Sequence, residues 1–135
     1  ILGLSQLPRL DSSVLKRREN FSKFLSLLDS EKFQVEFAEE GNSNYAFILI
    51  LKEANFQVRD QIEKQLNLNG IEFRRGLSGG GNQLRQPYLR RLKGMPDPET
   101  LPIVDHVHHF AWYIGNYPDI DGGIFIAISK ALKDI

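Results

Sequence analysis

The feature that most constrains the fold is an uninterrupted apolar run from Tyr45 to Leu51. Its length and its content of phenylalanine and isoleucine are typical of a strand buried on both faces. Shortly before it, Phe33, Val35 and Phe37 alternate with polar residues, and this period of two predicts another strand. We therefore expect a sheet with residues 45–51 at its centre and residues 33–37 paired beside them.

Apolar residues spaced three, four or seven apart predict a helix from about Asp11 to Leu28. A second helix is expected from Phe56 to Leu66, because Asn55 can cap its start and Asn69-Gly70 can end it. The other expected elements are a short strand at 71–74, a strand at 104–114 and a closing helix at 124–132. This order predicts a small α+β domain in which helices cover a mainly antiparallel sheet of roughly three to four strands.

The composition favours one domain of ordinary size and excludes several classes of function. Lysine plus arginine equals aspartate plus glutamate at 17 each, so no overall field attracts nucleic acid or an anionic membrane. The absence of cysteine removes disulfides and thiolate metal sites, and it fits a reducing compartment, for which the cytoplasm is the expectation. No apolar run is long enough for a membrane span. The start at Ile1, inside a helical pattern, suggests a piece cut from a longer chain.

The segment from residue 76 to residue 102 is rich in glycine and proline and poor in apolar residues, which predicts a long loop. A loop of that length in a small domain favours contact with a ligand or partner. After the glycines at 79–81, the side chains of Asn82, Gln83, Arg85 and Gln86 offer directed hydrogen bonds that suit a hydroxyl-rich ligand such as a sugar. The spacing matches neither a phosphate loop nor a dinucleotide fingerprint. The alternative interpretation is a loop that is merely flexible and solvated.

Three histidines, His106, His108 and His109, raise the question of a metal site. If residues 104–114 form a strand, His106 and His108 share one face and His109 lies on the other. A third ligand is then missing, so ordinary hydrogen-bonded histidines are the preferred interpretation and no metal is expected. No triad order or paired-carboxylate spacing stands out, and catalysis cannot be deduced from the chain itself.

Three segments carry a resemblance to a known family. The residues of Ile1–Leu7 with Leu10-Asp11 and Arg17–Asn20 look like a helix that leads from a large domain into a small one. The strand Gly70–Arg74 and the run Phe110–Pro118, with its Gly-Asn-x-Pro, match in the same order. The chain thus resembles, over nearly its whole length, the C-terminal part of the DegT/StrS family of sugar aminotransferases and dehydratases. Within the family, Gly81–Pro87 is most similar to the branch that contains CDP-4-keto-6-deoxyglucose 3-dehydrase, with an added Gln83 and without the histidine-bearing loop of typical aminotransferases.

The resemblance implies the C-terminal small domain of a larger enzyme, of the aminotransferase type with fold type I. Pyridoxal or pyridoxamine phosphate (PLP or PMP) would be held by the large domain, with a Schiff-base lysine in aminotransferases and a histidine in 3-dehydrases. The substrate would be a nucleotide-linked 4-keto-6-deoxy sugar of deoxysugar or lipopolysaccharide biosynthesis, and the enzyme a homodimer. Residues 1–28 would be the inter-domain helix and residues 76–102 the substrate-facing loop. The expected sugar-contacting residues are Asn82, Arg85, Gln86 and Gln83, followed by Arg74 and His109.

The resemblance also implies that this chain alone is inactive and binds no cofactor. Two alternatives stay open. The reaction could be transamination rather than dehydration, or the chain could be a module that binds a sugar nucleotide or a protein without catalysis.

Overall fold

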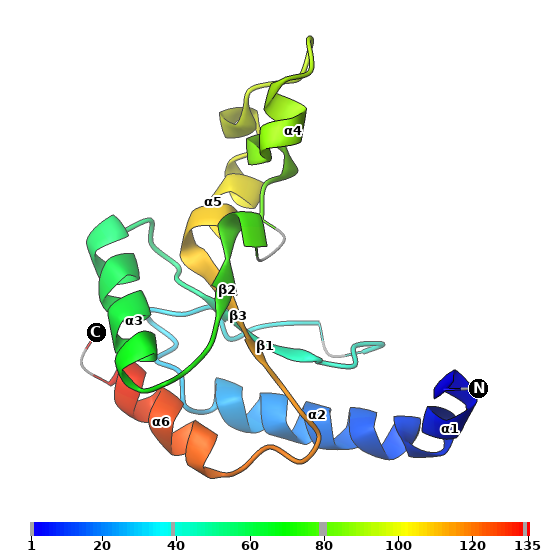
Figure 1. Ribbon diagram of the computed structural model, residues 1–135. Coiled ribbons are helices and arrows are strands. Elements are labelled where there is room, and N and C mark those ends of the chain that lie inside the picture. The colour runs from blue at the N-terminus through cyan, green and yellow to red at the C-terminus, as the bar shows by residue number, and fades with distance from the viewer. Residues whose placement is uncertain (1, 39, 79–80, 134) are drawn as a thin grey trace.

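The computed structural model describes residues 2–38, 40–78, 81–133 and 135. Its centre is a three-stranded antiparallel sheet in the order β1-β3-β2. The strands are β1 (Ala46–Ile50), β2 (Arg74–Arg75) and β3 (Ala111–Gly115) (Figure 1). β3 is therefore the central strand, paired along its whole length with β1 and at two positions with β2, and the expectation that residues 45–51 lie at the centre of the sheet is wrong. The α+β class and the antiparallel sheet predicted from the sequence are confirmed.

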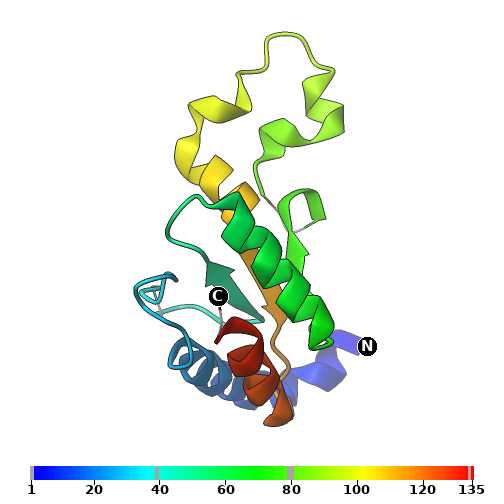
Figure 2. The same cartoon turned by 90° about the vertical axis from the view of Figure 1, so that its left-hand side faces the viewer.

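Three helices cover one face of this sheet, as Figures 1 and 2 show: α2 (Leu10–Leu25), α3 (Phe56–Leu68) and α6 (Gly123–Leu132). Phe47 and Leu49 of β1 and Trp112 and Ile114 of β3 are buried against them. Alternate residues point to opposite faces of a strand, so the intervening side chains of β1 and β3 lie on the other face, where most of them stay partly exposed. The helices bury one side of the sheet and leave the other available.

We call the sheet with α2, α3 and α6 the body. Its predicted helices are found close to their expected bounds. Asn55 caps α3, since its side-chain oxygen accepts hydrogen bonds from the backbone N–H groups of Gln57 and Val58. Ahead of α2 lie a short helix α1 (Leu2–Gln6) and a 3₁₀ turn η1 (Leu7–Arg9); Ile1 lies outside the described residues. The apolar stripe of this region is buried only in its second half, whereas Leu4 and Leu7 are 72% and 58% exposed.

Two predicted strands are corrected by the structure. The strand expected at 33–37 is wrong: in the described part of this segment, only Phe33 pairs, in an isolated bridge with Leu51. The alternating apolar residues pack on the core instead of extending the sheet, and Phe37 places its ring edge-on to Phe21 of α2. Apolar alternation therefore reported burial here rather than strand pairing.

The strand expected at 104–114 is wrong in its first half, where the chain forms helix α5 (Pro102–Phe110). Proline is favoured in the first turn of a helix, and Ile103, Val107 and Phe110 recur at helical spacing. The strand begins only at Ala111. His106 and His108 consequently do not share a strand face.

Asn116, which follows β3, ties the body together. Its buried Nδ2 donates hydrogen bonds to the carbonyl oxygens of Arg17 and Asn44, at 2.8 and 2.7 Å. Its Oδ1 accepts one from Nδ2 of Asn20 at 3.2 Å. This residue thereby joins the end of β3 to α2 and to the turn before β1.

Candidate functional site

The segment expected to be an open loop is folded into an arm, which we define as residues 76–78 and 81–110. It contains the 3₁₀ turns η2 (Gly76–Ser78), η3 (Gln83–Arg85) and η4 (Pro98–Thr100), the short helix α4 (Pro87–Arg90) and α5. The arm projects from the end of the sheet at β2 and returns through α5 into β3 (Figure 1). Of the three consecutive glycines noted in the sequence, Gly79 and Gly80 lie outside the described residues.

Asn82 is the buried centre of the arm, with 1% of its surface exposed. Its Nδ2 donates to the carbonyl oxygen of Pro98 at 3.0 Å and to Oδ1 of Asp105 at 3.1 Å. Its Oδ1 accepts from the backbone N–H of Leu84, and its own N–H donates to Nδ1 of His108. These contacts join the outgoing and returning halves of the arm, so every polar group of the side chain is engaged within the protein.

Arg85 and Asp105 form a bidentate ion pair across the arm. Nε of Arg85 lies 2.5 Å from Oδ1 of Asp105, and Nη2 lies 2.8 Å from Oδ2. Both side chains are less than one-fifth exposed. The hydrogen bonds from Arg85, together with the smaller effect of the bond from Asn82, lower the pKa of Asp105 to about 2 against the opposing effect of burial. The carboxylate therefore stays charged and fixes the guanidinium, and among the described residues Nη1 of Arg85 has no hydrogen-bond partner.

Gln83 and Gln86 flank Arg85 and each makes one contact through the side chain. Oε1 of Gln83 accepts a hydrogen bond from the hydroxyl of Tyr88 at 2.7 Å. Nε2 of Gln86 donates to the carbonyl oxygen of Leu77 at 3.1 Å. Gln83 is exposed and Gln86 half-buried, so each side chain keeps hydrogen-bonding groups within reach of a ligand at the surface of the arm.

His106 and His109 of α5 contact different parts of the protein. Nε2 of His106 donates to the carbonyl oxygen of Leu51 at 2.7 Å, in the tautomer that carries its proton there. His109 lies one turn after Asp105, with Nε2 3.8 Å from Oδ2, and its ring meets Phe56 edge-on. Burial lowers the pKa of His109, while Asp105 acts in the opposite direction. In the described residues, no group of three or more His, Asp or Glu side chains has the arrangement to hold a metal ion.

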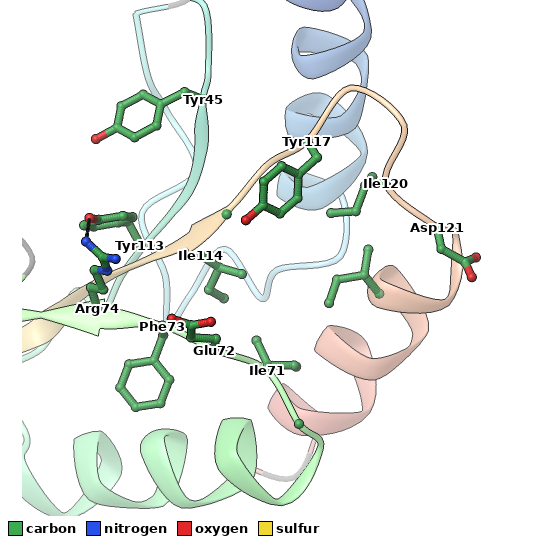
Figure 3. A pocket seen from close by; sticks show the side chains of 13 residues that line it. Tyr45, Ile71, Glu72, Phe73, Arg74, Tyr113, Ile114, Tyr117, Ile120 and Asp121 are labelled. Atoms are coloured by element: carbon green, nitrogen blue, oxygen red, sulfur yellow. Dashed lines mark hydrogen bonds between the residues drawn. The ribbon is translucent and has the colours of Figure 1, made fainter.

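Arg74 is the one predicted site residue that lies outside the arm. It is on β2, opposite Tyr113, and its Nη1 is 3.4 Å from the hydroxyl of that tyrosine. Arg74 borders a hollow of about 490 Å³ between the sheet edge and the start of α6, into which Tyr113 and Tyr117 also face (Figure 3). A smaller hollow of about 90 Å³ connects the position of Arg74 to Gly76 and Gly81 of the arm. The structure thus places Arg74 beside the base of the arm.

Asp105 and the contact of His108 with the arm were missed by the sequence reasoning. Both misses follow from the strand expected at 104–114, because an extended strand holds residues 105 and 109 on one face but too far apart for their side chains to meet. A helical period places residues four apart on one face and would have paired them. Pro102 was the available signal for that helix, and the buried polar groups of Asn82 and Arg85 then required a partner such as Asp105.

The described residues offer no lysine suited to form a Schiff base with PLP. All eight lysines of the chain, at 16, 23, 32, 52, 64, 93, 130 and 133, are exposed. The one cation among the described residues that line the hollow of about 490 Å³ is Arg74. An amine that reacts with the cofactor needs a desolvated pocket that lowers its pKa, and no described lysine lies in one. No helix in the described part of the chain is both long and apolar enough to span a bilayer.

Comparison with known proteins gives consistent results. Residues 1–130 match the model of the DegT/DnrJ/EryC1/StrS aminotransferase family. GDP-4-keto-6-deoxy-D-mannose 3-dehydratase of Yersinia pseudotuberculosis is 26% identical over 135 residues, which is 99% of this chain and 32% of that protein. The lipopolysaccharide biosynthesis protein RfbH of Salmonella typhimurium is 31% identical over 122 residues, covering 87% of this chain and 27% of that one.

A solved structure supports the fold. GDP-4-keto-6-deoxymannose-3-dehydratase, with a trapped PLP-glutamate geminal diamine, superimposes with a TM-score of 0.74 at 21% identity, over 96% of this chain and 33% of that one. The chain therefore spans about a third of the length of the relatives it matches. The family match extends from the first residue through most of α6 and includes the arm and the sheet. The chain belongs to the DegT/DnrJ/EryC1/StrS aminotransferase family.

Proposed function

We propose that this chain is the C-terminal small domain of a PLP- or PMP-dependent enzyme that acts on a nucleotide-linked 4-keto-6-deoxy sugar, and that the reaction is a 3-dehydration. The two curated relatives support this proposal, because one is named a GDP-4-keto-6-deoxy-D-mannose 3-dehydratase and the other a lipopolysaccharide biosynthesis protein. The chain would serve deoxysugar or lipopolysaccharide synthesis in the cytoplasm. CDP is the nucleotide we propose, from the resemblance of Gly81–Pro87 to the CDP-linked branch.

The observation that carries the proposal is the fixed guanidinium of Arg85. Asp105 holds two of its nitrogens, and Nη1 keeps its donors for a ligand. Gln83 lies on η3 together with Arg85, and Gln86 follows directly, between η3 and α4. A preorganised cation flanked by amides can donate to sugar hydroxyl or keto oxygens without first being ordered.

The other predicted residues would act around this centre. Asn82 is fully engaged, so we propose that it supports the site by holding η3 in place rather than by touching the sugar. His109 would contribute from α5, beside Asp105, and Arg74 from the base of the arm. These roles position the ligand and move no proton.

The cofactor would be held by the part of the enzyme that corresponds to the remaining two-thirds of the relatives. It supplies the electron sink for the chemistry. The exposed leucines Leu4, Leu7 and Leu10 support a contact of residues 1–28 with that part, since such side chains are normally covered when they gather on one short segment. The isolated chain would then be inactive, and the whole enzyme a homodimer.

Transamination is the second candidate reaction, because the family is named for aminotransferases. Mass spectrometry of the product separates the two. A 3-dehydration removes the C3 oxygen from the sugar and adds no nitrogen, whereas transamination replaces the keto oxygen by an amine.

The proposal is tested by calorimetric titration of the full-length enzyme with CDP- and GDP-linked 4-keto-6-deoxyhexoses. Arg85→Ala should weaken binding by about 1.5–3 kcal/mol, the range for a lost hydrogen bond to a charged group. Arg91→Ala is the matched control, since Arg91 is an exposed arginine at the end of α4 in the same arm, and the affinity of this variant should not change. Equal affinities of Arg85→Ala and the unmodified enzyme would remove the arm from the sugar site.

A further inference from the structure

We propose that His108 is a positioning residue for the arm, and that it holds the Asn82 segment in place only in its neutral form with the proton on Nε2. His108 lies on α5 and is 7% exposed. Its Nδ1 accepts the backbone N–H of Asn82 at 3.1 Å, so in this arrangement Nδ1 carries no proton. The contact therefore selects one tautomer of the ring, directly at the residue from which η3 starts.

The arm closes on this ring through two glycines. A Cβ at Gly81 would lie 3.0 Å from Cα of His108 and only 2.5 Å from its Nδ1. The shorter distance is one that a real Cβ essentially never shows. Gly76 lies on another side of the ring, where a Cβ would be 3.4 Å from Cε1, and it has a φ of +58° that favours glycine. The N–H of Gly81 donates to the carbonyl oxygen of Gly76 at 2.9 Å, which fastens the two glycines to each other around the imidazole.

Protonation of the ring would reverse the contact with Asn82. An imidazolium carries a proton on both nitrogens, so Nδ1 would change from acceptor to donor and face another N–H. The side chain of Asn82 would keep its bonds to Pro98 and Asp105, but its backbone N–H would lose its partner inside the protein. The expected result is a local loosening of the start of η3 rather than unfolding of the body.

Charged or titratable groups of η3, β2 and α5 act on His108. Arg85 of η3, Arg75 of β2 and His109 of α5 disfavour its protonated form, and Asp105 of α5 favours it. Burial is the largest effect and lowers the pKa of His108 below its ordinary 6.5. The unfolded chain binds the proton more readily than the folded chain. The contribution of this contact to stability is therefore complete above pH 6.5 and is lost as the pH falls below that value.

The test is nuclear magnetic resonance of the ¹⁵N-labelled chain without any sugar. At pH 7.5 the ring ¹⁵N shifts of His108 should report the tautomer with the proton on Nε2. As the pH falls below 6.5 and the ring takes up its second proton, the protection factor of the Asn82 amide, corrected for intrinsic exchange, should fall, by about tenfold once the ring is fully protonated, as expected for one lost hydrogen bond. A ring protonated on Nδ1 at pH 7.5 would overturn the proposal, and this readout needs no variant.

His108→Asn supplies the conservative variant, because Oδ1 of asparagine is bonded to Cγ like Nδ1 of histidine and accepts a hydrogen bond at every pH. Asn82 should stay protected in it from pH 7.5 to 5.5. His106→Asn is the matched control on the same helix, two residues away and bonded to Leu51 instead, and it should keep the tenfold change. A pH dependence that persists in His108→Asn, or that disappears in His106→Asn, would contradict the role of His108.

The consequence for ligand binding rests on the proposed function. If η3 contacts the sugar, the affinity of the full-length enzyme should fall between pH 7.5 and 5.5, and His108→Asn should lose this dependence. A pH-dependent Asn82 amide together with a pH-independent affinity would support the positioning role and count against the sugar at η3. The two proposals can therefore fail separately.

Discussion

The body and the arm of this chain are stabilised by different forces. In the body, apolar side chains from α2, α3, α6 and the sheet form one buried cluster, with Phe24 stacked on Phe47 at a centroid distance of 4.9 Å. In the arm, Asn82, Arg85 and Asp105 form a polar network, and much of the apolar surface is exposed, including Tyr88 and Leu92. Apolar burial tolerates changes of pH, whereas an ion pair and a buried histidine do not. The difference predicts a body whose stability changes little with pH and an arm whose contacts depend on pH.

The largest expected effect is on the body. Leu66→Ala removes a fully buried side chain of α3 and should lower the free energy of unfolding by about 2–5 kcal/mol, measured by chemical denaturation. Leu68→Ala is the matched control in the same turn, where Leu68 is 69% exposed, and should stay within about 0.5 kcal/mol. Similar losses in the two variants would show that apolar burial does not distinguish these positions.

The next effect tests the network of the arm. Asp105→Asn leaves Arg85 without its charged partner and should cost about 1.5–3 kcal/mol, seen by hydrogen exchange as faster exchange in the arm with little change in the body. Asp119→Asn is the control: Asp119 pairs with Lys16 at 2.5 Å, but its side chain is 84% exposed, so less than about 1 kcal/mol is expected. Uniform loss of protection through the body would contradict the separation of the two regions.

A smaller effect compares two glycines. Gly81→Ala forces a Cβ onto the ring of buried His108 and should cost about 1–3 kcal/mol, concentrated in the arm. Gly115→Ala in β3 brings a Cβ to 3.2 Å from the ring of Tyr117, which is 69% exposed and able to shift, so a change below about 0.5 kcal/mol is expected in thermal denaturation. If Gly81→Ala proved as stable as the unmodified chain, the arm would not close on His108.

The smallest effect is the acid response of Asp105. Since Arg85 lowers the pKa of this carboxyl from 3.8 to about 2, its contribution to stability is complete above pH 3.8 and is lost as the pH falls from there toward 2. At pH 3 only part of it should be lost. The difference in melting temperature between Asp105→Asn and the unmodified chain should therefore narrow from pH 6 to pH 3. A constant difference over that range would contradict the shift in pKa.

Regular periodicity predicted the body well, and local chemistry explains where prediction failed. The apolar run 45–51 and the capped helix after Asn55 are found as β1 and α3, because their patterns report burial and capping that the chain itself provides. Residues 33–37 show the limit, since alternation is satisfied equally by packing on α2. The apolar stripe that contains Leu4 and Leu7 shows a second limit, because an apolar pattern does not indicate which part of a protein covers these side chains.

The arm was predicted as a location but not as a structure. Its residues Asn82, Arg85 and Gln86 were identified from their donors and from a family resemblance, yet the main partners of Asn82 and Arg85 lie on η4 and α5, more than fifteen residues away in the sequence. Such contacts depend on how the chain returns, which no local pattern encodes. Because of the mistaken strand at 104–110, Asp105 and the contact of His108 with the arm were not predicted, although Pro102 indicated the helix.

The central claim is that the arm contacts the nucleotide-linked sugar. The most direct test is hydrogen exchange of the full-length enzyme with and without a 4-keto-6-deoxyhexose nucleotide. The account predicts added protection of backbone amides at residues 83–86 and little change in α2 and α6. Saturating ligand that leaves residues 83–86 unchanged while protecting other parts of the enzyme would contradict it.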